Sequence, residues 1–188
     1  MTNDLRIRPA CPADVPALAT IHIETWRDTY ADLLPAAYLV SLNPGRVEFE
    51  WQRTLARPSQ EFVLVGEHPD NGVVGFVSGG PNRTASPGAA ARFQGEIYTL
   101  YVGTDHQGDG IGRQLVAAIG ERLVRREMDS VLVWVVAGNP ARFFYRRLGA
   151  QQVAERRERF AGAEIDQIAF GWTDIRRSVF PVGRAFQP

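Results

Sequence analysis

Hydrophobic and polar positions along the first part of the chain predict one short strand and one long helix. Residues 5–8 alternate apolar side chains with arginine before Pro9, which is typical of a strand that a proline ends. Prolines and an aspartate between residues 12 and 16 are helix-start signals, and apolar side chains then recur at helical spacing to about Tyr30. We therefore expect a strand followed by a helix.

A second helical region and a hairpin are expected before the middle of the chain. Asn43 and Pro44 are typical of an N-cap and a first helical position. Large apolar side chains follow at every fourth position, at Val47, Trp51 and Leu55. Further on, two β-branched runs, 62–66 and 73–78, flank a turn that ends in Asn-Gly, which predicts a hairpin.

The second half of the chain alternates strands and helices more clearly. The range 96–102 has a strand pattern, and a helix from about 110 to 127 follows it. That helix carries one apolar stripe, formed by Leu115, Ile119 and Leu123. The later elements are a buried strand over 131–136, a short helix over 140–148 closed by Gly149, and a hairpin of 151–160 and 164–172. Residues 79–95 are rich in Gly, Ala, Pro and Ser without any period, which predicts a long loop.

The order of elements, β-αα-β-β-β-α-β-α-β-β, predicts an α/β fold with a sheet of mixed direction and helices on both faces. At 188 residues, without a repeat or a linker, the chain fits a single domain over 1–172. Residues 173–188 form a C-terminal tail, in which Arg176, Arg177, Phe180 and Phe186 have no clear period. We expect this tail to dock on its own domain or on a neighbouring molecule rather than to take part in catalysis.

Composition and charge argue against several classes of partner. Hydrophobic residues make up 45% and charged residues 22%, as in ordinary soluble domains, and 21 basic residues balance 21 acidic ones. Without net charge or a long basic run, we expect no nucleic acid and no membrane partner. No 18 apolar residues run together, and the first ten residues lack a signal-peptide core. The single Cys11 suits a reducing compartment, so we expect a cytoplasmic protein.

The clearest chemical signal is the segment 107–112, which lies between a predicted strand and a predicted helix. Its three glycines allow the backbone to approach a ligand closely, and free N–H groups at a helix start attract anions. The spacing differs from the dinucleotide motif G-x-G-x-x-G, because Arg113 holds the final position, and no Walker Lys-Ser/Thr follows. From the glycines alone, two interpretations stay open: a phosphate-binding turn, or a tight turn with a close helix–strand contact.

A second motif brings a resemblance to a known family. Residues 107–112 fit the Q/R-x-x-G-x-G/A signature of the GNAT N-acetyltransferase superfamily, and the strand before them resembles that family's fourth strand. Residues 139–150 resemble its N-P-A-x-x-F-Y-x-x-L-G-F segment, except that Ala150 stands where an aromatic residue is usual. The resemblance covers about residues 5–172. It implies a GNAT-type, mostly antiparallel central sheet with splayed strands four and five and helices on both faces.

The resemblance implies acetyl-CoA as co-substrate and a set of residues that bind it. The backbone of three strand residues would hold the pantetheine arm: Leu100, Tyr101 and Val102. The backbone of the glycine-rich turn would hold the pyrophosphate: Gln107, Gly108, Asp109, Gly110, Ile111 and Gly112. Asn139 resembles the family's cofactor-contacting Asn, while its other interpretation is a helix cap before Pro140, and the two roles are compatible.

Tyr145 is the candidate general acid. A phenol with a pKa near 10 is protonated at neutral pH and can donate a proton to the thiolate that leaves the thioester. Tyr145 lies in the segment 139–150 that resembles the family's second motif. The alternative interpretation is an aromatic side chain of the short helix that packs beside Phe143 and Phe144.

Glu96 is the first candidate for the general base. It lies eleven residues before Gln107, where histone-type members of the superfamily carry their base. Strand alternation predicts that Glu96 shares a face with Tyr98, Leu100 and Val102, and burial there would raise its pKa. The alternatives are a solvated or substrate-binding carboxylate, with a chain of water molecules acting as the base.

The acceptor is expected to be a small-molecule or peptide amine. By analogy with the family, the first long helix walls the acceptor pocket, which makes Glu24, Trp26 and Tyr30 candidate substrate-binding residues. Trp26 and Tyr30, four residues apart on one helix face, are alternatively core residues. The three histidines lack metal-ligand spacing, so no metal is expected. By analogy with the family, the final hairpin and the apolar tail suggest a homodimer.

The sequence therefore predicts an N-acetyltransferase that transfers an acetyl group from acetyl-CoA to a primary amine by direct attack in a ternary complex. One alternative is a non-catalytic GNAT-like domain that binds acyl-CoA as a sensor or scaffold. Another is a nucleotide-phosphate-binding α/β domain of a different family, which would have parallel strands on each side of the glycine-rich turn.

Overall fold

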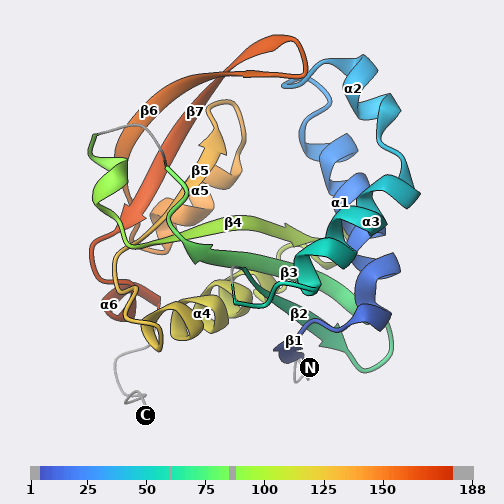
Figure 1. Ribbon diagram of the computed structural model, residues 1–188, viewed down its shortest axis with the longest axis horizontal. Helices are drawn as coiled ribbons and strands as arrows, with labels where there is room; N and C mark the ends of the chain where they lie inside the picture. The colour runs from blue at the N-terminus through green and yellow to red at the C-terminus, as the bar shows by residue number, and fades with distance from the viewer. Residues whose placement is uncertain (1–4, 60, 85–87, 180–188) are drawn as a thin grey trace.

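The computed structural model describes residues 5–59, 61–84 and 88–179 (Figure 1). Within these residues, seven strands form one sheet in the order β1-β2-β3-β4-β5-β7-β6. The strands are β1 (Arg6–Pro9), β2 (Phe62–His68), β3 (Gly72–Pro81), β4 (Gly95–Val102), β5 (Val131–Val136), β6 (Gln151–Phe160) and β7 (Ala163–Trp172). All neighbours pair antiparallel except β4 and β5, which are parallel. The predicted mixed, mostly antiparallel sheet is confirmed.

The helices follow the predicted order, with two short additions. They are α1 (Val15–Thr29), α2 (Ala36–Ser41), α3 (Pro44–Leu55), α4 (Ile111–Val124), α5 (Ala141–Arg147) and α6 (Ile175–Val179). Asn43 caps α3 as expected, because its side chain accepts a hydrogen bond from the Arg46 N–H at 3.2 Å. The sequence did not predict α2. It is too short for a periodic signal, and its Leu39 is buried beside Leu34 and Ile165 of β7.

Helices cover both faces of the sheet, so the central strands are buried on both sides (Figure 1). Along β2, Val63 and Val65 pack with α1 and α3, whereas Phe62 and Leu64 belong to the core under α4. This division fixes where later residues lie, because successive strand residues point to opposite faces.

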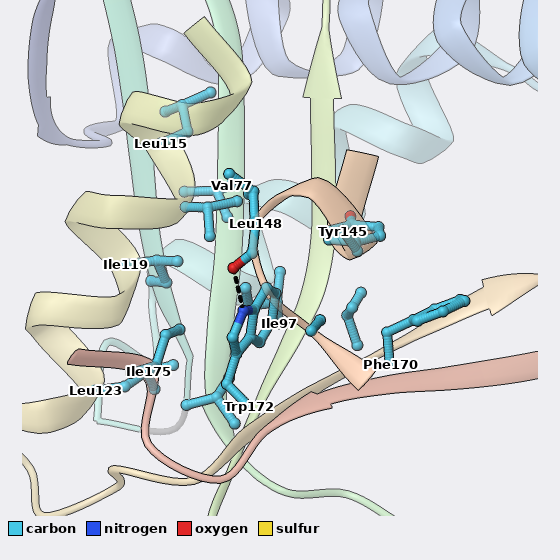
Figure 2. Close-up of a cluster of buried hydrophobic side chains, with 14 of the residues drawn as sticks. Val77, Ile97, Leu115, Ile119, Leu123, Tyr145, Leu148, Phe170, Trp172 and Ile175 are labelled. Carbon is cyan, nitrogen blue, oxygen red and sulfur yellow. Dashed lines mark hydrogen bonds between the residues drawn. The ribbon is translucent and has the colours of Figure 1, made fainter. Parts of the chain in front are cut away.

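The core under α4 contains the predicted apolar stripe. Leu115, Ile119 and Leu123 are each 0% exposed, and Figure 2 shows them in succession along α4, with Leu123 near Ile175. Trp172 satisfies its one polar group there, because its Nε1 donates a hydrogen bond to the Leu148 carbonyl at 2.8 Å. The hydrogen bond and the packing join α4, β7 and the end of α5 in one core.

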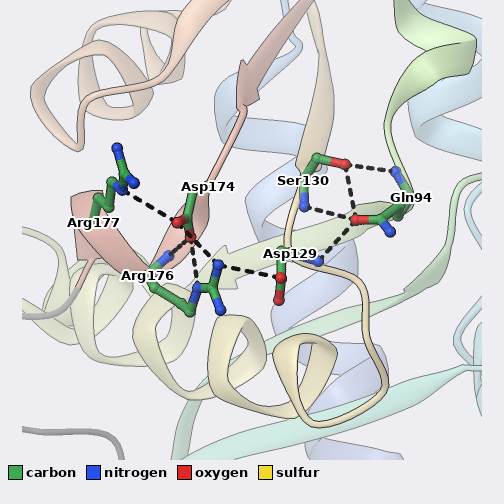
Figure 3. Close-up of polar contacts among 6 residues, drawn as sticks. All are labelled: Gln94, Asp129, Ser130, Asp174, Arg176 and Arg177. Atoms are coloured by element: carbon green, nitrogen blue, oxygen red, sulfur yellow. Dashed lines mark hydrogen bonds and ion pairs between the residues drawn. The ribbon is translucent and has the colours of Figure 1, made fainter.

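The first residues after Trp172 pack on the same domain. Ile175 is fully buried against Gly120 of α4. Figure 3 shows Arg176 bridging Asp174 and Asp129, with N–O distances of 2.8 and 3.2 Å. Gln94, in the same view, accepts hydrogen bonds from the residues before β5 and so closes the start of β4 against β5. Of the tail residues named above, Phe180 and Phe186 lie outside the described residues.

Strand β4 carries the irregularity that opens the sheet. Its register with β3 pairs Ser78 with Thr99 and Gly79 with Ile97, so Tyr98 is an extra residue in a β-bulge. Gly79 permits this close approach, since a Cβ there would lie 2.8 Å from the Glu96 carbonyl oxygen. On the other edge of β4, pairing with β5 ends at Ile97 opposite Val133. Beyond this point the two strands are splayed apart, as predicted.

Candidate active site

A cavity of about 660 Å³ lies between the splayed ends of β4 and β5. Residues 98–102 of β4 line one side and residues 133–135 of β5 line the other. The remaining walls come from the second half of α1, the start of α4, and α5 with the residues before it. The volume is in the range of small-molecule and cofactor sites.

The β4 wall offers backbone groups to a ligand. Within the described chain, no strand pairs with the β5-facing edge of β4 after Ile97, and Leu100, Tyr101 and Val102 all line the cavity. Backbone N–H and C=O groups left unpaired by a strand are ready partners for an extended ligand that carries amides. The site therefore fits a ligand that lies along β4 as an added strand would.

The glycine-rich turn forms one end of the cavity. Gly108 and Gly110 have φ angles of +93° and +81°, values that favour glycine. The Gln107 side chain donates a hydrogen bond to the Val102 carbonyl at 3.1 Å, which ties the turn to the end of β4. Helix α4 then begins at Ile111, and its first N–H groups lie at the positive end of the helix dipole. Uncharged backbone can hold a phosphate here.

Close helix packing accompanies the glycine-rich turn, so both interpretations of the glycines stay compatible with the structure. A Cβ on Gly112 would lie 3.4 Å from the Phe144 ring of α5. Except for Asp109, all residues of 107–112 line the cavity. Arg113 and Arg147 line it as well, and they add positive charge that the motif comparison did not single out.

Tyr145 belongs both to the core and to the cavity. It is 5% exposed, lines the cavity, and packs edge-on against Phe144 and Trp172 with ring centroids 5.2 and 6.2 Å away. Burial, with a smaller effect of the neighbouring Tyr30, raises the pKa of the Tyr145 phenol above its ordinary value. The hydroxyl is therefore protonated over the whole neutral range.

Asn139 has the helix-capping role and also lines the cavity. Its Oδ1 accepts a hydrogen bond from the Ala141 N–H at 2.8 Å, and its Nδ2 donates to the Tyr30 hydroxyl at 3.2 Å. The side chain is buried at 6% exposure. Contact of Asn139 with a cofactor stays a prediction.

Glu96 does not lie where strand alternation places it. Ile97 before the bulge and Leu100 and Val102 after it all contact the core under α4, so Glu96 faces the opposite side of the sheet. The predicted shared face was wrong, because the extra residue Tyr98 reverses the alternation. Glu96 is outside the cavity lining.

The environment of the Glu96 carboxyl group nevertheless raises its pKa. It is 9% exposed and accepts a hydrogen bond from the Arg83 N–H at 2.8 Å. Burial raises its pKa above the ordinary value, and the Arg83 N–H together with the charges of Arg156 and Arg83 only partly offsets this. The group thus holds its proton to a higher pH than an exposed glutamate does.

The three candidates on α1 have different environments. Glu24 is exposed and outside the cavity lining. Trp26 is also outside it, and its ring packs against Tyr30 and Tyr38 with centroids 5.2 and 5.9 Å away. Tyr30 lines the cavity. The structure therefore brings Tyr30, Tyr101, Asn139 and Tyr145 together and leaves Glu24, Trp26 and Glu96 outside.

Several lining residues carried no sequence signal. Thr25 sits inside an ordinary helical pattern, and Trp134 inside a continuous apolar strand. Trp134 follows Val133, the last β5 residue that pairs with β4, and Thr25 reaches the cavity from α1. Among the described residues, no three His, Cys, Asp or Glu side chains gather as metal ligands. Within the same residues, no helix has the length and apolar character needed to cross a membrane.

The splayed strands, the glycine-rich helix start and the shared cavity define an α/β domain built to bind an extended anionic ligand. Comparison with known proteins narrows this class. Residues 73–160 match the family model of FR47-like proteins. The chain is 33% identical to YuaI, an uncharacterized N-acetyltransferase of Bacillus subtilis (strain 168), over 90% of this chain and 93% of YuaI.

Solved structures agree with this relationship. The ribosomal-protein-alanine N-acetyltransferase of Brucella melitensis matches with a TM-score of 0.68 and 28% identity, over 90% of this chain and 99% of that one. YncA of Salmonella typhimurium, solved with acetyl-CoA, matches in fold with a TM-score of 0.65 and 22% identity, over 90% and 94% of the two chains. The chain belongs to the GNAT N-acetyltransferase superfamily. Membership of this superfamily excludes the alternative of a nucleotide-phosphate-binding α/β domain of a different family. The parallel pairing of β4 and β5 alone would not exclude it, because that alternative also has parallel strands on each side of the glycine-rich turn.

Proposed function

We propose that the protein transfers an acetyl group from acetyl-CoA to the primary amine of a small molecule or peptide, by direct attack in a ternary complex. The observation that carries the proposal is the shared cavity. Its lining includes the glycine-rich turn at the start of α4, the unpaired edge of β4 and the hydroxyl-bearing Tyr145. Relatives that are N-acetyltransferases by name support acetyl transfer to nitrogen.

Acetyl-CoA lies with its pantetheine arm along Leu100 to Val102 and its pyrophosphate on the backbone of 107–112. The unpaired β4 edge and the positive helix start supply complementary groups for these two parts. Arg113 and Arg147 in the lining add charge for the phosphates. The fold-level likeness to YncA, solved with acetyl-CoA, supports this placement.

The reaction needs a neutral amine, a stabilised oxyanion and a proton for the leaving group. The amine nitrogen bonds to the thioester carbon, and backbone N–H groups of the β4 edge stabilise the tetrahedral oxyanion. The C–S bond then breaks, and the Tyr145 phenol gives its proton to the thiolate. Burial weakens this phenol as an acid. It also makes a thiolate in the same cavity more basic, because both charged forms lose solvation.

Glu96 accepts the proton that the amine loses. Since Glu96 lies outside the cavity lining, the proton travels through water between the amine and the carboxylate. The raised pKa of Glu96 makes its carboxylate a better base than an exposed one.

Replacement of Tyr145 by Phe tests the chemistry. Release of CoA thiol is followed with a panel of amines, and acetyl-CoA affinity is measured by calorimetry. Because only the hydroxyl is removed, turnover should fall roughly a hundredfold while acetyl-CoA affinity changes by less than about twofold. Unchanged turnover would remove Tyr145 as the acid. If the wild-type protein binds acetyl-CoA but none of the amines in the panel leads to release of CoA thiol, the result would instead favour the sensor or scaffold alternative.

A further inference from the structure

Two tyrosines in the cavity lining meet at Trp26. Tyr30, at the end of α1, has its ring centroid 5.2 Å from that of Trp26. Tyr101, on β4, has its hydroxyl oxygen 2.8 Å from the Trp26 Nε1. The ring of Tyr101 packs against Phe76, which holds it on the α1 side of the sheet. Tyr30 and Tyr101 thus come from different elements, line the same cavity and share contacts with Trp26.

The hydrogen-bond directions at both phenols are fixed by their partners. The indole N–H of Trp26 can only donate, so the Tyr101 oxygen accepts. The Oδ1 of Asn139 is held by the Ala141 N–H, which fixes the amide orientation and directs Nδ2 to the Tyr30 oxygen. Tyr30 also accepts. Each phenol then has one proton left to donate, and among the described residues neither proton has a protein acceptor.

We propose that the O–H groups of Tyr30 and Tyr101 bind a neutral carbonyl oxygen of the acceptor, adjacent to its reacting amine. The acceptor class is therefore an α-amino acyl compound with a blocked carboxyl group, either a peptide N-terminus or an amino-acid amide. Alkylamines and polyamines lack this oxygen. This inference rests on the proposed function and names the substrate class of the same site.

Three other sets of hydrogen-bonding groups in the cavity are assigned to the cofactor by the proposed function. The glycine-rich turn serves the pyrophosphate, the β4 backbone serves pantetheine and the oxyanion, and Tyr145 serves the thiolate. We therefore assign the Tyr30 and Tyr101 hydroxyls to an oxygen of the acceptor, and the buried Thr25 hydroxyl of the same lining is a further polar neighbour of that group. An amine without such an oxygen leaves the two O–H groups without an acceptor group on the substrate, which costs affinity.

The character of the donors favours a neutral oxygen over a carboxylate. Burial raises the pKa of both phenols, so they remain uncharged donors. The arginines of the lining belong to the cofactor end: Arg113 follows Gly112, and Arg147 is one turn after Phe144, whose ring contacts Gly112. A carboxylate beside the phenols would lose water without gaining a positive partner.

Alaninamide and isopropylamine form a matched pair of acceptors, because they differ only in a carboxamide group against a methyl group. Initial rates of CoA release give kcat/KM for wild type, Tyr30→Phe and Tyr101→Phe with each amine. For alaninamide, each substitution should lower kcat/KM by roughly three- to tenfold, the usual cost of one neutral hydrogen bond. For isopropylamine, each substitution should change kcat/KM by less than about twofold. Comparing variant with wild type for the same amine cancels the difference in amine pKa.

Tyr38→Phe is the control, since Tyr38 packs against Trp26 but lies outside the cavity lining. It should leave both rates within about twofold of wild type. Equal losses with both amines in Tyr30→Phe and Tyr101→Phe would assign the hydroxyls to the thioester or to the fold and overturn the inference. A wild-type preference for alanine over alaninamide would overturn the neutral-oxygen assignment. Each of these results leaves the proposed function intact, whereas failure to bind acetyl-CoA would overturn both.

Discussion

At the scale of single residues, Glu96 combines burial with a proposed role in proton transfer. Its pKa is raised above the ordinary value of 4.5, chiefly by burial. A carboxyl group with a raised pKa in the folded state contributes stability that is present below the unfolded pKa. That contribution is lost as the pH rises through the folded pKa. The charged form that the proposed base role requires is therefore the form that destabilises the fold.

Glu96→Gln should separate stability from activity. The amide keeps an oxygen for the Arg83 N–H and carries no charge, so the variant should melt at a higher temperature than wild type at about pH 8 and at a similar one near pH 4. Thermal unfolding across this range checks the prediction. A melting difference that does not change with pH would contradict the raised pKa.

The same substitution should lower kcat/KM roughly a hundredfold and remove the contribution of Glu96 to the acid limb of the pH–rate profile, because a protonated base cannot accept the amine proton. The contribution of the amine's own protonation should remain. Wild type should lose activity as the pH falls through the raised pKa of Glu96. Glu121→Gln on the exposed face of α4 is the control and should keep the wild-type profile. An intact acid limb in Glu96→Gln would assign the base to another group.

The residues found from sequence were those in local motifs. The glycine-rich turn and Tyr145 follow from short patterns, and both line the cavity. The side of the sheet on which Glu96 lies depends on the β-bulge at Tyr98, which reverses the strand alternation. No pattern in the sequence predicts this bulge. The phenol pair of Tyr30 and Tyr101 depends on contacts between α1 and β4, about 70 residues apart in the chain, and no local pattern reports such contacts.

At the scale of elements, local chemistry predicted the helices that have their own caps and apolar stripes. Helix α3 is an example, with Asn43 as N-cap and buried Val47 and Trp51 one turn apart. The short α2 and α6 were not predicted, because a helix of this size is held by its tertiary contacts rather than by periodicity. The splay of β4 from β5 came from the family resemblance alone.

Asn43→Ala should destabilise the fold by about 1 kcal/mol, because the Arg46 N–H loses its acceptor. For a domain of this size the melting temperature should fall by roughly 2–4 °C. Gln52→Ala, at an exposed position of the same helix, should change it little. Calorimetry of both variants checks the assignment, and equal melting temperatures for Asn43→Ala and wild type would contradict the capping role.

At the scale of the whole molecule, the chain continues to pack against α4 after Trp172. Because Ile175 is fully buried against α4, the residues after β7 contribute to the core. Ile175→Ala should therefore cost about 2–5 kcal/mol, as removal of a buried apolar side chain does. The exposed Arg177→Ala is the control and should cost far less. A small loss in Ile175→Ala, measured by denaturant unfolding, would show that α6 is dispensable.

The fold, the cavity and the family relationship all support one central proposal, which is that the helix start at Gly110 binds the pyrophosphate of acetyl-CoA. Gly110→Asp places a negative charge there, and Gly162→Asp in the β6–β7 turn is its matched control. Gly110 and Gly162 have φ angles of +81° and +84°, and a Cβ at either meets no atom within 4 Å. The two substitutions therefore impose similar backbone strain.

Titration calorimetry with acetyl-CoA compares wild type with these two variants. Wild type and Gly162→Asp should bind acetyl-CoA with similar affinity, whereas Gly110→Asp should bind at least about tenfold more weakly, because its carboxylate repels the phosphates. Wild-type affinity in Gly110→Asp would contradict the pyrophosphate assignment and the central claim with it.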